Sequence, residues 1–253
     1  INNAGSDCQD WSGANNYYRS IGYTIVMDKI PPIGNEVQNM QKIFQCRIIL
    51  VRHGECRGNL ENRFRGRMDY PLNETGRKQA DELAQALAKF RPARVYSSPL
   101  KRAMETAFPL CEELHTGIET REGFNNIALG DWEGKLKSEI AEKYPHEWKV
   151  WLSNPEKLEL EGAETFRDVQ DRSFEALREL AHAHPDDTIV VVSHRTTLKP
   201  LIARCLGLPE PYFWKFHVDT GSYSIIDFSE SRGFSLYQLN QTLHLSDLNI
   251  EWA

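Results

Sequence analysis

The fold of this chain is decided by the segment LVRHGEC, which runs from Leu50 to Cys56. It completes the apolar run 47–51, which is typical of a short strand buried on both faces. An arginine, a histidine and a glycine follow at the point where this strand should end. In an open α/β sheet, ligands bind at the carboxyl ends of the strands. A guanidinium and an imidazole on a glycine turn suit an oxyanion, so the segment predicts a site for a group such as phosphate.

Two further apolar runs are followed by residues of the same kind. The run 93–96 precedes SSPLKRA, which contains Arg102 and opens a helix that continues through Thr106. The run 189–192 precedes Ser193 and His194. If the three strand ends converge, two imidazoles and two guanidiniums surround a single dianion.

The segments between these strands predict the fold class. Asn73 is a candidate N-cap for a helix with apolar residues at 80, 83, 84 and 87. Further helices are expected over 164–184 and 198–206, and a closing hairpin over 222–228 and 234–239. Strands that alternate with helices predict an α/β three-layer sandwich, in which helices cover both faces of a mostly parallel sheet.

From about Cys46 to the C-terminus, these motifs resemble the histidine phosphatase superfamily, also called the phosphoglycerate mutase-like family. The matching stretches are LVRHGE, Asn59, RFRG at 63–66, DYPLNETG at 69–76, SSPLKRA with Thr106, GDWEG at 130–134, and VVVSH ending at His194. The resemblance implies a phosphoglycerate mutase-like fold and phosphoryl chemistry. It says little about the substrate.

The resemblance also implies roles for particular residues. His53 is the residue that becomes phosphorylated, which suits a neutral imidazole because it is nucleophilic at neutral pH. The matching phosphate ligands are Arg52, Arg102 and His194, with Asn59 as a further donor and Arg63 facing the phosphate or the substrate. Two arginines, and a histidine if it is protonated, provide the charge that a metal would otherwise supply. We therefore expect no metal and no other cofactor.

The sequence departs from the family pattern at two places. The general acid is normally a Glu or Asp four residues before the first glycine of GDWEG, but Asn126 stands there. An amide has no proton to transfer near neutrality, so the alternative acid is Glu122, which lies four residues earlier and could reach the site if the loop is shifted. After the second histidine, Arg195 and Lys199 replace small residues. Either is a candidate for binding a further anionic group of the substrate, although a surface position is more ordinary for Lys199.

These observations predict a metal-independent phosphatase that hydrolyses a small phosphomonoester through a phosphohistidine. The expected substrate is a sugar phosphate or a phosphorylated carboxylate. A phosphoglycerate-type mutase is the first alternative, but residues 99–121 leave no room for the insertion that such mutases usually carry. A catalytically weakened phosphate-binding or regulatory module is the second alternative, and Asn126 favours it.

The amino-acid composition limits the kinds of partner that this chain can bind. The 253 residues carry a formal net charge of −6, which argues against general affinity for nucleic acid. Five arginines nevertheless lie close together and predict a positive funnel over the anion site: Arg52, Arg57, Arg63, Arg65 and Arg67. The expected partner is thus a small phosphorylated metabolite, and association between copies of the chain is left open.

Residues 1–45 do not match the rest, and we interpret them as an N-terminal extension or the remnant of an upstream domain, followed by a histidine phosphatase domain over 46–253. The five cysteines are scattered and unpaired in spacing, which favours reduced thiols and a cytoplasmic location. No apolar stretch approaches the length of a membrane span, so no membrane association is expected.

Overall fold

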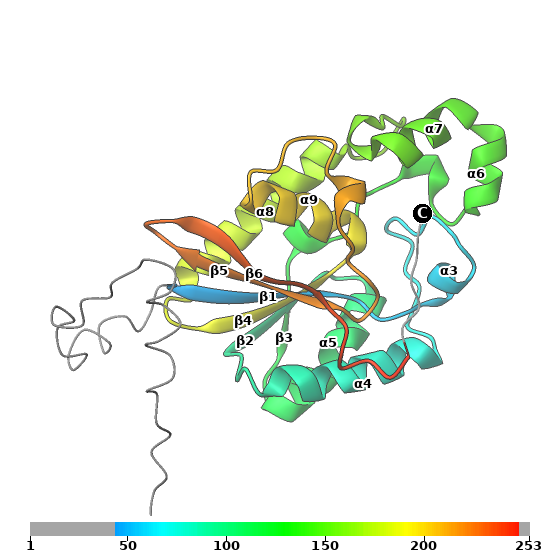
Figure 1. Cartoon of the computed structure of the whole chain (residues 1–253). Coiled ribbons are helices and arrows are strands. Elements are labelled where there is room, and N and C mark those ends of the chain that lie inside the picture. Colours follow the sequence, from blue (N-terminus) through cyan, green and yellow to red (C-terminus); the bar gives the residue numbers. More distant parts are fainter. Residues whose placement is uncertain (1–43, 248–253) are drawn as a thin grey trace, which may run out of the picture. The chain divides into compact units, whose positions relative to one another are not determined.

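The computed structural model describes residues 44–247, so the prediction for residues 1–45 lies, except for its last two residues, outside the described part. A six-stranded sheet with the order β3-β2-β4-β1-β5-β6 forms the centre of this part (Figure 1). Its strands are β1 (Cys46–Arg52), β2 (Arg94–Ser97), β3 (Ile118–Thr120), β4 (Thr188–Ser193), β5 (Tyr223–Ser229) and β6 (Gly233–Gln241).

Four neighbouring strands of this sheet are parallel. β1 pairs with β4, β4 with β2, and β2 with β3, all in parallel register. The predicted hairpin is present as β5 and β6, which pair antiparallel, and β5 also pairs antiparallel with β1. The sheet is therefore mostly parallel, as predicted.

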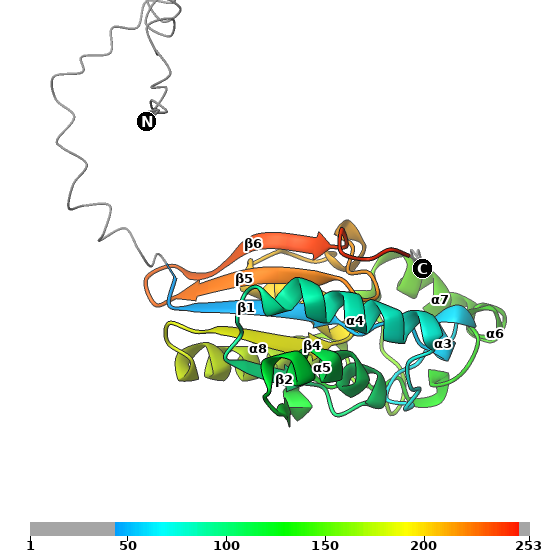
Figure 2. The same cartoon turned by 90° about the horizontal axis from the view of Figure 1, so that it is seen from below.

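Helices cover both faces of the sheet, which confirms the three-layer prediction. α4 and α5 lie on one face, and α8 and α9 lie on the other (Figures 1 and 2). The bounds of the α-helices are α3 (Arg57–Leu60), α4 (Glu74–Ala88), α5 (Lys101–Leu114), α6 (Lys137–Lys143), α7 (Pro145–Ser153), α8 (Phe166–Ala183) and α9 (Arg195–Cys205). Short 3-10 turns occupy 122–124, 130–132, 155–157 and 213–215.

The continuous apolar run of β1 is explained by these two layers. Ile48 and Leu50 pack in the core beneath α8 and α9, whereas Ile49 and Val51 pack in the core beneath α4 and α5. All four side chains are at most 1% exposed. Because successive strand residues point to opposite faces, a strand with helices on both sides needs apolar residues at every position.

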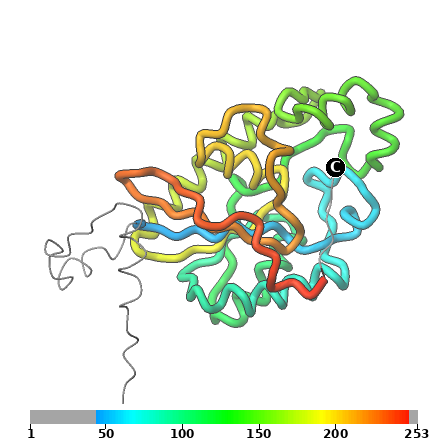
Figure 3. The backbone as a smooth tube through the Cα atoms, viewed as in Figure 1, coloured from blue at the N-terminus to red at the C-terminus, as the bar shows by residue number. Residues whose placement is uncertain are grey.

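A third hydrophobic cluster lies among the loops at the carboxyl end of the sheet, and it was not predicted. Phe64 packs against Trp132 and Trp151, with ring centroids 4.9 and 5.1 Å away. This cluster joins the loop after β1, drawn in cyan, to the green segment that holds α6 and α7 (Figure 3). It holds together loops that come from distant parts of the sequence.

Two helix starts lie directly against the end of β1 and β4. Asn73 caps α4 as predicted, because its Oδ1 accepts a hydrogen bond from Gly76 N at 2.8 Å. A Cβ on Gly76 would lie 1.9 Å from Glu55 O, so only glycine allows α4 to approach the turn after β1. α9 begins at Arg195, three residues earlier than predicted. Its first turn is polar, which is why the apolar periodicity begins only at Leu198.

Candidate active site

The ends of β1 and β4 and the first turn of α5 bring together four side chains that we call the phosphate pocket: Arg52, His53, Arg102 and His194. Each is at most 1% exposed. The ring centroids of the two histidines are 5.1 Å apart, and Arg102 Nε donates to His194 Nδ1 at 3.3 Å. The convergence expected from the three strand ends is therefore present in the fold.

The hydrogen bond of His53 fixes its tautomer. Its Nδ1 lies 2.7 Å from Gly54 O, and a carbonyl oxygen only accepts hydrogen bonds. Nδ1 must therefore carry the proton, and in the neutral ring Nε2 keeps its lone pair. This is the form that a nucleophilic histidine requires.

His194 is also neutral, so it does not add the positive charge that a protonated histidine would supply. Its Nδ1 accepts from Arg102, because a guanidinium only donates. Its Nε2–H then donates to Ser98 Oγ at 2.7 Å. Burial, together with the charges of Arg102 and other neighbours, lowers the pKa of His194 well below its usual value.

The same causes act on His53. Burial lowers its pKa well below the ordinary value, and the positive charges of Arg102, Arg52 and Arg65 lower it further. The two guanidiniums of the phosphate pocket thus keep the nucleophile unprotonated. They are themselves anchored by backbone carbonyls, since Arg52 donates to Val218 O at 2.8 Å and Arg102 donates to Gly66 O at 2.9 Å.

His53 and His194 lie at the inner end of a pocket whose wall carries several polar side chains. We call this wall the outer pocket: Arg63, Arg65, Asn126, Lys137, Arg195 and Thr196. Phe64, Gly66, Leu129 and Trp151 complete the lining. Three predicted site residues, Arg63, Asn126 and Arg195, are thus placed with His53 around one cavity.

Four predicted site residues are not among those that line this cavity: the buried Arg52 and Arg102 of the phosphate pocket, and Asn59 and Glu122. Asn59 is buried in the turn that begins α3, where its Oδ1 accepts from Cys56 N at 3.1 Å. Glu122 is exposed at the start of a 3-10 turn, and its carboxylate accepts from Asn125 Nδ2 at 3.0 Å. The structure therefore does not bring Glu122 to the phosphate pocket.

Two other expectations need correction. The five arginines expected to form one funnel are dispersed, because Arg57 forms an exposed ion pair with Glu61 and Arg67 pairs with Glu164 at 3.1 Å. Lys199 is buried rather than on the surface. Its Nζ donates to Phe213 O at 2.5 Å, and burial lowers its pKa to about 7.

The sequence pattern missed Lys137 and Thr196. Arg63 and Leu136 form an antiparallel bridge between two loops, which places Lys137 beside Arg63. Thr196 reaches the cavity because α9 starts directly after His194. The bridge has no signal in the sequence. Thr196 would have been identified if α9 had been predicted to start directly after His194.

Residues 44–247 contain neither a metal-binding cluster nor a membrane-spanning helix. No group of three or more His, Cys, Asp or Glu side chains there is arranged to hold a metal ion. In the same part of the chain, no helix combines the length and the apolar character needed to cross a bilayer.

Comparison with known proteins gives consistent matches. A family model described as histidine phosphatase superfamily (branch 1) matches residues 48–242. Phosphoserine phosphatase 1 of Hydrogenobacter thermophilus is 37% identical over 205 residues, which cover 81% of this chain and 97% of that protein. A metal-independent phosphoserine phosphatase of Arabidopsis thaliana is 37% identical over 164 residues, covering 62% of this chain and 67% of that protein.

A solved structure has the same fold. It is a phosphoserine phosphatase from Entamoeba histolytica in complex with 3-phosphoglyceric acid. The TM-score is 0.71 at 28% identity, and the match covers 79% of this chain and 99% of that chain.

Proposed function

This chain belongs to the histidine phosphatase superfamily, and we propose that it releases phosphate from a small phosphorylated metabolite through a phosphohistidine at His53. Its relatives are named phosphatases, so it is a phosphoric monoester hydrolase, and the mutase alternative is less supported. One observation carries the proposal. The proton of His53 is held on Nδ1 by Gly54 O, which leaves Nε2 free to attack phosphorus.

The reaction proceeds in two displacements. Nε2 of His53 forms a bond to phosphorus while the bond from phosphorus to the leaving oxygen breaks, and water then displaces the phosphoryl group from the histidine. The charge that develops on the equatorial oxygens is stabilised by Arg52 and Arg102, which are already fixed by their carbonyl partners. Retention of this complete set argues against a module that only binds phosphate.

The outer pocket favours a phosphorylated carboxylate over a neutral sugar phosphate. Arg63, Arg65, Lys137 and Arg195 line it, and among the described residues 44–247 none that lines it is acidic. A second anionic group on the substrate would therefore meet opposite charges. The complex of the Entamoeba histolytica relative with 3-phosphoglyceric acid is consistent with such a ligand.

A cytoplasmic location is part of the same proposal. Four cysteines, Cys46, Cys56, Cys111 and Cys205, lie in the described part of the chain, and none of them forms a disulfide. Free thiols of this kind persist in a reducing compartment.

The test is a panel of phosphorylated metabolites assayed for phosphate release, followed by acid quenching during turnover. We expect an acid-labile, base-stable phosphate on His53, and His53→Ala should lose at least about a thousandfold in kcat. His146→Ala, which changes an exposed histidine, is the control. EDTA should leave the rate unchanged. Near-normal turnover by His53→Ala would exclude this mechanism.

A further inference from the structure

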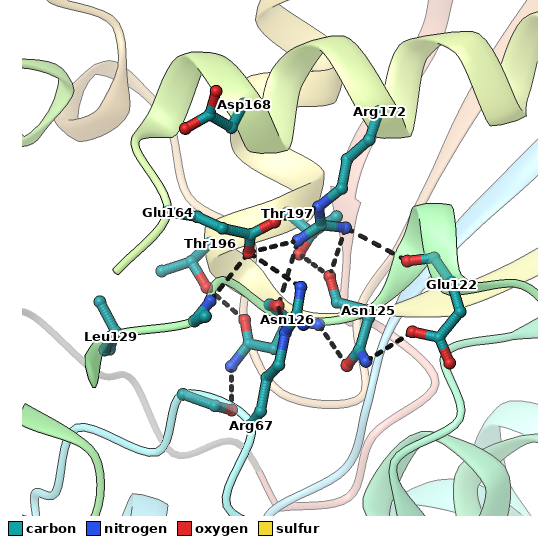
Figure 4. Close-up of polar contacts among 12 residues, drawn as sticks. Arg67, Glu122, Asn125, Asn126, Leu129, Glu164, Asp168, Arg172, Thr196 and Thr197 are labelled. Atoms are coloured by element: carbon teal, nitrogen blue, oxygen red, sulfur yellow. Dashed lines mark hydrogen bonds and ion pairs between the residues drawn. The ribbon is translucent and has the colours of Figure 1, made fainter. Parts of the chain in front are cut away.

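The residue at the family's general-acid position is held by hydrogen bonds on both sides of its amide (Figure 4). Asn126 Nδ2 donates to Gly66 O at 2.7 Å, and its Oδ1 accepts from the hydroxyl of Thr196. The side chain is 5% exposed and lines the pocket that contains His53. It occupies the place of an acid, but an amide has no proton to give at neutral pH.

The loop that carries Asn126 is tied to α8 by hydrogen bonds, which hold Asn126 at this place. The guanidinium of Arg172 donates to Gly123 O at 2.8 Å, Asn125 O at 2.9 Å and Asn126 O at 3.1 Å. Its Nε also donates to Glu164 at 2.8 Å. Figure 4 shows this guanidinium at the centre of the loop's carbonyl groups.

The remaining acidic candidates have other partners. Glu122 is exposed and bonded to Asn125, as described above. Asp69 accepts from Lys101 N at 2.7 Å, at the start of α5. Asp219 accepts from Asn240 Nδ2 at 2.7 Å. Within the part of the chain that the structure describes, neither these three nor any other Asp or Glu lines the pocket.

The pocket instead surrounds the leaving group with positive charge. Arg65, Lys137 and Arg195 line it together with Arg63, whose Nε is paired with Glu61 at 2.6 Å. Such charges stabilise an oxygen that leaves as an anion, whereas a carboxylic acid would deliver a proton to it. The site therefore suits a leaving group that needs no proton and carries additional negative charge.

We propose, on the basis of the phosphatase function above, that the preferred substrate is a phosphate ester of an acidic hydroxyl group, a phenol or an enol, that also carries a carboxylate. In the first step, Nε2 of His53 forms the N–P bond. The P–O bond breaks and both of its electrons remain on the leaving oxygen, which departs as a phenolate or enolate. Water then forms a P–O bond, the N–P bond breaks, and the two protons of that water are taken up by phosphate and solvent.

The experiment compares kcat/KM for esters that differ in the leaving oxygen. The probes are 3-carboxyphenyl phosphate for the phenol, phosphoenolpyruvate for the enol, and phosphoserine and 3-phosphoglycerate for alkyl esters. General acid catalysis typically contributes about a hundredfold or more. We therefore expect kcat/KM for 3-carboxyphenyl phosphate or for phosphoenolpyruvate to exceed that for both alkyl esters by at least about a hundredfold. The one with the higher kcat/KM shows whether the acidic hydroxyl is a phenol or an enol.

The second comparison concerns the additional anion. 3-Carbamoylphenyl phosphate matches the carboxyphenyl ester in shape but lacks its charge. The carboxylate should raise kcat/KM about tenfold, and Arg195→Met should reduce that advantage. Equal rates for the two esters would overturn the requirement for a second anion.

Variants at Asn126 test the missing proton directly. Asn126→Glu introduces an acid, and the rate on phosphoserine relative to 3-carboxyphenyl phosphate should rise at least about tenfold. Asn126→Gln has the same length without a transferable proton, and the ratio should stay as in the native chain. Because the readout is a ratio, a partly folded variant does not distort it.

The outcomes separate this inference from the proposed function. If the native chain hydrolyses phosphoserine as fast as both activated esters, the inference is wrong while the phosphatase function stands. The inference is also wrong if an active Asn126→Glu variant keeps the native ratio of the rate on phosphoserine to the rate on 3-carboxyphenyl phosphate. If no probe is hydrolysed in a His53-dependent manner, the proposed function itself fails.

Discussion

The phosphate pocket and the outer pocket meet at one cavity, to which the phosphate pocket contributes His53 and His194, but they are built in different ways. The phosphate pocket is formed at the ends of adjacent parallel strands and the first turn of a helix, and its four side chains are at most 1% exposed. The outer pocket is formed by loops and the first turns of α6 and α9, and Arg63, Arg65 and Lys137 are half-buried. The sheet thus fixes the groups that act on phosphorus, whereas loops supply the groups that meet the rest of the substrate.

This difference predicts unequal losses when one arginine is removed from each region. Arg102→Met removes a fixed donor from the phosphate pocket and should lower kcat by roughly 100- to 1,000-fold. Arg63→Met removes a half-buried arginine of the outer pocket and should mainly raise KM. Steady-state kinetics with 3-carboxyphenyl phosphate, which carries a second anionic group, measure both changes. Similar kcat losses in the two variants would contradict the division between the regions.

The next prediction concerns what holds the outer pocket in place. Arg172 donates to four carbonyls of the loop that carries Asn126 and pairs with Glu164. Because Arg172→Met leaves those carbonyls and Glu164 without their partner, it should lower the free energy of unfolding by about 3 kcal/mol. Urea denaturation measures the change.

Another arginine of α8 provides the matched control. Arg178 forms an exposed ion pair with Glu175, in which the two side chains are 50% and 53% exposed. Arg178→Met should change the free energy of unfolding by less than about 1 kcal/mol. An equal effect of the two substitutions would show that α8 does not clamp the loop through Arg172.

The contrast between the two regions also explains how far sequence reasoning reached. The phosphate pocket was predictable because a buried apolar strand has a recognisable pattern, and parallel strands must end at the same edge of the sheet. The tautomer of His53 was not predictable from the sequence, because it depends on a hydrogen bond to the carbonyl of the next residue. Nor did the pattern reveal that His194 is neutral.

The outer pocket was only partly predictable. Asn126 and Arg195 stood out because they depart from a known pattern. Lys137 did not, because it reaches the cavity through the bridge between Arg63 and Leu136, and through the aromatic cluster that joins the same loops. Such contacts between loops have no periodicity, so residues that depend on them are found only in the folded chain.

The smallest predicted effect arises behind the outer pocket, at Lys199. Its ammonium lies 4.5 Å from the Phe213 ring centroid and 5.2 Å from that of Trp214, which also stacks with Arg195 at 5.7 Å. Burial and, to a smaller extent, the charges of Arg195 and Arg52 lower the pKa of Lys199 to about 7, whereas Asp219 and Glu156 act in the opposite direction. In the unfolded chain, the pKa of a lysine is about 10.4.

These two values set the direction of a pH effect on stability. Between pH 7 and 10.4, Lys199 is protonated in the unfolded chain but largely neutral in the folded one, so the free energy of unfolding rises with pH by up to about 1.4 kcal/mol per unit. Below pH 7 the buried charge destabilises the fold.

Lys199→Met removes this contribution, and its stability relative to the native chain should be greatest at pH 6 and decline above pH 7. The lost bond to Phe213 O shifts the whole difference without changing its slope. Urea denaturation from pH 6 to 9 measures the slope, and Lys215→Met, at an exposed lysine of the same segment, should give a flat difference. A flat difference for Lys199→Met as well would mean that Lys199 keeps its proton in the folded chain, beside the like charge of Arg195.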